Sequence, residues 1–272
     1  MAVAMQDAGE GEAGGTAPDH GDTLPHGDTL YFRDTAHRKS TVVPMTVWDR
    51  PEPANRPVPL DRERIVAAAV ALADEGGLEA VSLRKVAARL NAGPMRLYGY
   101  IATKEELFDL MLDEVQAEIL PMEPPGDWRE ALSTLAHRTR RTALRHTWLA
   151  DLLGGRPALG PNGLAVAEAT LAAFDDTADI DTTLRAVETV SAYFTGAIRR
   201  EIAHLRAERA TGLTKEDWQR ASGPHLTRTL ATGRFPALSR AVYDGTDVDA
   251  ETSFATGLDW VLDAVAARLA RP

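Results

Sequence analysis

Residues 82–102, with the sequence SLRKVAARLNAGPMRLYGYIA, decide how this chain folds. Ser82 is a favourable helix N-cap, and the apolar residues that follow it recur at helical spacing. Asn91 tolerates the left-handed conformation that a tight turn needs, and Gly93 and Pro94 suit the start of a second short helix. Two short helices around such a turn are typical of a helix-turn-helix, a DNA-reading motif. The residues expected to face inward are Leu83, Val86, Ala87, Leu90, Leu97 and Ile101.

The charge of the chain is distributed unevenly. Its formal net charge is −10, and residues 1–30 contain six acidic residues but no lysine or arginine. Between Glu79 and Glu105 the sequence has no acidic residue and five basic ones, namely Arg84, Lys85, Arg89, Arg96 and Lys104. An acidic chain with one concentrated basic segment suits a small DNA-reading module on a body that does not bind DNA. A helical hairpin with a solvated basic face is the alternative reading of the pattern.

We expect the outward faces of these two helices to be exposed, with Tyr100 among them. Guanidinium and ammonium groups neutralise phosphates, and tyrosines offer a ring for thymine methyl groups. Arg84, Lys85 and Lys104 are therefore expected to position the DNA backbone. Base reading is expected from Arg96, Tyr98 and Tyr100. The full set of predicted DNA-binding residues is Ser82, Arg84, Lys85, Gly93, Pro94, Met95, Arg96, Tyr98, Tyr100 and Lys104.

The whole chain is predicted to be all-α, because period-two alternation of apolar residues is nowhere sustained. Helix-capping patterns and helical spacing predict further helices at 103–119, 127–146, 147–153, 161–174, 181–210, 214–232 and 249–270. Residues 1–59 are predicted to be a disordered acidic and proline-rich extension, and docking of Trp48 with Arg50 on the body or on DNA is the alternative. The expected organisation is this extension, a helix-turn-helix domain at 60–120 and a helical domain at 121–272.

Residues 60–112, LDRERIVAAAVALADEGGLEAVSLRKVAARLNAGPMRLYGYIATKEELFDLML, resemble the N-terminal DNA-binding domain of the tetracycline-repressor-like (TetR) family. The resemblance implies that the third helix, with Leu97 and Tyr98, enters the major groove and that Lys104 contacts phosphate. The chain departs from the family pattern at Asn91, often glycine, at Gly99, usually bulkier, and at Tyr100, where histidine is common. These departures leave the operator sequence unspecified.

Residues 144–174, LRHTWLADLLGGRPALGPNGLAVAEATLAAF, are similar to the C-terminal domain of the same family. The resemblance implies a cavity for a small-molecule effector of unknown identity and a homodimer formed through the last long helices, 181–210 and 249–270. The large aromatic side chains of this part either pack in the core or line the effector pocket. The residues predicted for the pocket, as aromatic walls or polar anchors, are Trp148, Arg156, Phe174, Tyr193, Phe194 and Thr195.

Several other classes of protein are disfavoured by the sequence. The chain has no cysteine, no long apolar run and no secretory signal pattern, so we expect a cytoplasmic, nucleoid-associated protein without a membrane segment. No nucleophile elbow or nucleotide-binding loop is present, and we expect no enzyme activity, no cofactor and no metal site, although Glu201 and His204 share a helix face. The expected function is a ligand-responsive repressor. An activator, or a helical ligand-binding or protein-interaction module that never touches DNA, is the alternative.

Overall fold

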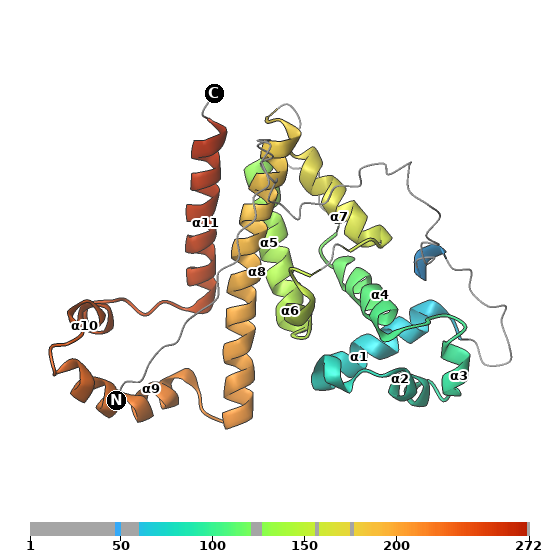
Figure 1. The fold of residues 1–272 in the computed structure, drawn as a ribbon, viewed down its shortest axis with the longest axis horizontal. Coiled ribbons are helices and arrows are strands. Elements are labelled where there is room, and N and C mark those ends of the chain that lie inside the picture. The colour runs from blue at the N-terminus through green and yellow to red at the C-terminus, as the bar shows by residue number, and fades with distance from the viewer. Residues whose placement is uncertain (1–46, 50–59, 121–126, 156–157, 175–176, 271–272) are drawn as a thin grey trace, which may run out of the picture. The chain divides into compact units, whose positions relative to one another are not determined.

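The computed structural model describes residues 47–49, 60–120, 127–155, 158–174 and 177–270, and every regular element in these ranges is a helix (Figure 1). The all-α prediction is confirmed. The elements in chain order are η1 (Val47–Asp49), α1 (Arg62–Ala80), α2 (Leu83–Arg89), α3 (Pro94–Leu97), α4 (Lys104–Gln116), α5 (Trp128–Arg145), α6 (Leu149–Leu152), α7 (Pro161–Ala172), α8 (Ile180–Thr211), α9 (Lys215–Leu230), α10 (Pro236–Tyr243) and α11 (Ala250–Leu269). Within these ranges no helix is long and apolar enough to span a bilayer.

Helices α1 to α4 pack on one another and form the unit that we call the head. Three of the four helices begin at a side-chain cap: Asp61 accepts the N–H of Arg64, Ser82 that of Lys85, and Thr103 that of Glu106. These caps satisfy backbone donors that have no partner inside the helix. The fully buried side chains at the centre of the head are Ile65, Val86, Ala87, Leu97, Ile101 and Leu107.

Two residues of the head adopt the left-handed backbone conformation. Gly77, with a φ of 73°, lies in a kink near the end of α1, and Asn91, with a φ of 51°, lies in the turn between α2 and α3. Asparagine is one of the few residues other than glycine that tolerate this conformation. The sequence-based assignment of the turn is confirmed, and the turn aims α3 away from α2.

The remaining helices form the body, in which α8 packs against α5, α6, α7 and α11. Fully buried apolar side chains of α8, such as Ile198 and Ile202, and of α11, such as Phe254, fill the space between them. Helix α10 was not predicted from the sequence. It begins at Pro236, packs against α9 and buries none of its own side chains.

Two sets of polar contacts lie between the head and the body, besides the bonds from Arg138 of α5 to the Ile119 oxygen and from Arg145 to Glu118. The first, which we call the clasp, consists of Asp74 of α1, Glu118 after α4, and His146 and Trp148 between α5 and α6. The second, the α4–α7 joint, consists of Asp113 of α4 with Gly160, Asn162 and Gly163 at the start of α7.

Candidate functional site

The outward edge of α2 and α3 carries exposed cationic and aromatic side chains. Arg84 and Lys85 are exposed on α2, and Met95 and Tyr98 on and after α3 expose 79% and 51% of their surface. Pro94 is exposed at the first position of α3, directly after the N-cap Gly93. Apolar and aromatic groups held in contact with water at these levels are available to a partner.

Arg96 and Lys104 complete the cationic set on this edge. Arg96 is half-buried on α3, and Lys104 is exposed at the first position of α4. The Lys104 ammonium lies 5.0 Å from the centre of the Phe108 ring, one helical turn further along. This cation–π contact restrains the side chain near the surface without removing its charge.

The prediction that Tyr100 is exposed is wrong. Its side chain is only 5% exposed, and its hydroxyl donates a hydrogen bond of 2.5 Å to the backbone oxygen of Leu60. The cause is that α3 ends at Leu97, so the residues after it follow a turn in which the N–H groups of Tyr100 and Ile101 both bond the Leu97 oxygen. Tyr100 therefore ties the start of α1 to the recognition region and is not available to read bases.

Arg89 is engaged within the head itself. Its guanidinium donates two hydrogen bonds to the Glu75 carboxylate, of 2.9 and 2.8 Å, and so joins α2 to α1. These bonds hold the pKa of Glu75 below its ordinary value. The charge count from sequence included Arg89, but its partner lies outside the acid-free segment. The outward edge is correspondingly less cationic than the count suggested.

The residues predicted for an effector pocket differ in burial and in contacts in the structure. Trp148 is fully buried, Phe174 and Phe194 are buried, and Phe174 stacks on Trp128. Thr195 is half-buried, and the Tyr193 hydroxyl donates a 2.9 Å bond to the Phe254 oxygen in α11. Arg156 lies outside the described residues. For Trp148 the observed contact is the clasp, where its indole N–H donates to Asp74.

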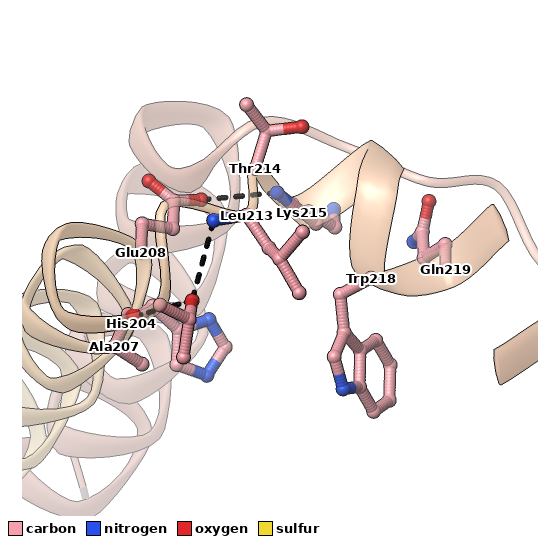
Figure 2. A pocket seen from close by; sticks show the side chains of 9 residues that line it. His204, Ala207, Glu208, Leu213, Thr214, Lys215, Trp218 and Gln219 are labelled. Carbon is pink, nitrogen blue, oxygen red and sulfur yellow. Dashed lines mark hydrogen bonds between the residues drawn. The ribbon is translucent and has the colours of Figure 1, made fainter. Parts of the chain in front are cut away.

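A pocket of about 410 Å³ lies between the end of α8 and the start of α9. Figure 2 shows the His204 imidazole and the Trp218 indole on opposite sides of it, with Leu213 between them. A neighbouring pocket of about 370 Å³ extends to Phe254 in α11 and shares His204, Glu208 and Lys215 with the first. None of the five predicted pocket residues that the structure describes lines either of these two spaces, so sequence reasoning missed them.

A nearly buried ion pair borders the second pocket. The Arg140 guanidinium of α5 donates two hydrogen bonds, of 2.8 and 2.7 Å, to the Glu201 carboxylate of α8. Their side chains are 12% and 15% exposed, and the carboxylate raises the pKa of Arg140 above its ordinary value. The same guanidinium lies over the Phe254 ring, which also meets His137 edge to face. The Glu201 carboxylate is therefore already occupied by a cation and is not paired with His204 in a metal site. Among the described residues, no group of three or more histidine, aspartate or glutamate side chains converges as a metal site would require.

Comparison with known proteins places both parts of the chain. Residues 65–111 match the family model "Bacterial regulatory proteins, tetR family", and residues 120–269 match the model "Tetracyclin repressor-like, C-terminal domain". The HTH-type transcriptional repressor DrrR1 of Streptomyces coeruleorubidus is 39% identical over 230 residues, 80% of this chain and 83% of that protein. An HTH-type transcriptional regulator of Saccharopolyspora erythraea is 40% identical over 164 residues, 58% of this chain and 68% of that protein. The crystal structure of the TetR family protein ActR of Streptomyces coelicolor in complex with actinorhodin is 28% identical, covers 78% of this chain and all of that one, and superimposes with a TM-score of 0.66.

Proposed function

Because the chain belongs to the TetR family of DNA-binding transcriptional regulators, and is not an enzyme, we propose that it represses transcription from its operator until a small molecule releases it. The observation that carries the DNA-binding half is the outward edge of α2 and α3, where Arg84, Lys85, Tyr98 and Lys104 are exposed around a rigid turn. The head spans residues 60–120 and the body 121–272 in this proposal. The proposed site of action is the cytoplasm, at the nucleoid, because the proposed partner is operator DNA.

Within this edge we assign different roles to different side chains. Lys104, Arg84 and Lys85 position the backbone, because an exposed cation neutralises a phosphate of any sequence. Arg96 and Tyr98 read bases from α3, with Met95 providing apolar contact in the groove. Ser82 and Gly93 are the N-caps of the two helices, and the backbone N–H groups at these helix starts bind phosphates. Pro94 has no N–H and instead allows the phosphate backbone to approach the start of α3 closely.

The operator is proposed to be near-palindromic, because we propose a homodimer whose two heads read successive major grooves. Helices α8 and α11 pair within the chain through Phe254, Leu258 and Leu262, and still expose a second face. On α11 this face carries Trp260, which is 72% exposed, beside Ala264 and Ala267. A large exposed aromatic among small residues suits a two-fold helix bundle.

The effector is proposed to bind in the body. ActR has been crystallised with actinorhodin and with (S)-DNPA. In this chain the pockets beside α8 combine an indole, an imidazole and carboxylates, a lining that suits an organic molecule with an aromatic portion and a few polar groups. Release requires that the effector bind one orientation of the heads more tightly than the other.

Binding to DNA upstream of the gene, measured by gel shift at several salt concentrations, tests the DNA-binding half. Lys104→Ala should weaken binding to every sequence and lower the salt slope by about 1. Arg96→Ala and Tyr98→Ala should change which sequences a random pool yields, with about 1–3 kcal/mol lost per base contact. Arg228→Ala, which removes an exposed cation from α9, is the matched control and should change neither. Absence of any shift at low salt would favour a module that does not bind DNA.

A further inference from the structure

The clasp brings one imidazole between two carboxylates at the boundary of head and body. Nδ1 of His146 lies 2.8 Å from Oδ1 of Asp74, and Nε2 lies 3.2 Å from Oε1 of Glu118. The indole N–H of Trp148 donates to the same Asp74 oxygen at 2.7 Å. The His146 side chain is 13% exposed, whereas the two carboxylates are about a third exposed. One side chain of the body thus contacts two carboxylates carried by α1 and by the segment after α4.

The chemistry of imidazole decides the charge of His146 in this arrangement. A neutral imidazole has one N–H and one lone pair, so it donates to one carboxylate and turns its lone pair toward the other. Only the imidazolium donates on both sides. We propose that the clasp depends on the protonation of His146. The imidazolium binds both carboxylates and so joins head to body, whereas the neutral imidazole loses its hydrogen bond to one of them.

The other charges around the clasp are consistent with this reading. On the body side, Arg145 bonds the second oxygen of Glu118, and Arg138 and Arg141 line the same hollow as Glu118. Arg206 of α8 binds the Thr147 oxygen and is paired with Asp151. On the head side, Glu75, next to Asp74, is occupied by Arg89. In the part of the chain that the structure describes, His146 is therefore the cationic partner of the Asp74 carboxylate, and Trp148 is its neutral donor.

The sign of the pH effect follows from this pairing. Histidine changes charge between about pH 5 and pH 8, and aspartate and glutamate stay ionised in that window. Only the cationic form donates to both carboxylates, so the clasp is closed at the acidic end of this window and opens as the pH rises. The functional consequence rests on the proposed function. A head that is held at α4 but no longer at α1 keeps its spacing from its dimer partner less precisely, and affinity for a two-half-site operator falls.

The closing experiment separates the clasp from DNA binding. In the full-length protein without DNA, amide hydrogen exchange in the second half of α1 is measured from pH 6 to pH 8 and corrected for the intrinsic rate. The corrected exchange rate should increase with pH in the wild type. In His146→Gln it should be high at every pH and should not change with pH. In parallel, affinity for DNA selected from a random pool by the wild type should fall at least threefold more over this range for the wild type than for His146→Gln.

One control variant removes a histidine outside the clasp, and a second variant changes the carboxylate side of the same contact. His225→Gln removes an exposed imidazole from α9 and should keep the wild-type pH dependence. Asp74→Asn removes the charge from the opposite side of the contact and should flatten the pH dependence as His146→Gln does. Equal pH dependence in the wild type, His146→Gln and Asp74→Asn would overturn the proposal. Normal exchange behaviour in a protein that binds no DNA would instead refute the proposed function and leave the clasp standing.

Discussion

The two links between head and body use different physical means. The clasp relies on charged groups, and its carboxylates are about a third exposed. In the α4–α7 joint, Asp113 is 5% exposed and its Oδ1 accepts the Gly163 N–H at 2.9 Å, while Asn162 donates to Oδ2 at 3.2 Å. One link is open to water, protons and salt, and the other is closed to them. The comparison suggests a fixed joint at α4 and an adjustable one at α1.

The joint is fixed because α7 depends on it for its N-terminal cap. Helix α7 begins after Gly160, which has no side chain to satisfy the free N–H groups of the first turn. The Asp113 carboxylate supplies that cap from another helix and also meets the positive end of the helix dipole. A Cβ at Gly160 would overlap the Asp113 carboxylate, so the glycine is needed for the close approach.

Asp113→Ala should have the largest effect on stability. It removes the cap and leaves the buried Gly163 N–H without a partner, and we expect a loss of about 2–3 kcal/mol in the free energy of unfolding. Urea denaturation followed by circular dichroism measures it. Glu114→Ala, on the exposed side of the same helix, should stay within about 0.5 kcal/mol of the wild type. A loss below about 1 kcal/mol for Asp113→Ala would mean that α7 finds another cap.

Gly163→Ala should come next in magnitude. An added Cβ would lie 2.5 Å from Oε1 of Gln116 and 2.7 Å from Cβ of Ala158, and overpacking of this kind costs about 1–3 kcal/mol. Gly196→Ala is the matched control, because a Cβ at this exposed position of helix α8 meets nothing within 4 Å. This control has no proline after it and should be neutral or slightly stabilising in the same urea experiment, since alanine favours helix. Equal behaviour of the two variants would show that the joint relaxes to admit a methyl group.

The sequence predicted the head well because its signals are local. Asn91 indicated a left-handed turn, and Leu97 and Ile101 are buried as predicted. Tyr100 failed because helical spacing was continued past Leu97, whereas the real helix stops there and the following turn carries the ring inward. A four-residue helix offers too few positions for periodicity to detect its end.

The links and pockets escaped prediction because their partners are distant in sequence. Trp148 and Asp74 are 74 residues apart, and Asp113 and Gly163 are 50 apart. Composition shows that Trp148 is a large aromatic residue but does not show whether it faces a pocket or a carboxylate. Helix α10 was missed for another reason: it has only eight residues, which is a short stretch for helical periodicity to stand out.

Trp148→Phe tests the clasp with a smaller expected effect. Phenylalanine keeps most of the buried ring and removes the N–H that Asp74 accepts, so we expect a loss of about 1 kcal/mol in unfolding free energy. The proton sensitivity assigned to His146 should persist. Trp218→Phe, at a ring that is 62% exposed, should leave stability unchanged. An equal effect of the two substitutions would show that the indole N–H contributes nothing to the clasp.

Salt should separate the two links by the smallest effect of all. Raising KCl from 0.1 M to 1 M shortens the screening length from about 10 Å to about 3 Å, which weakens attraction between partly exposed charges. The stability lost in His146→Gln at pH 6 should therefore shrink by a few tenths of a kcal/mol at high salt. The penalty of Gly163→Ala involves no charge and should stay constant in the same titration. Because the Asp113 contact is buried, its penalty should also change little. If the Asp113→Ala and His146→Gln penalties fell together with salt, the division into a closed link and an open one would be wrong, and both would act as surface ion contacts.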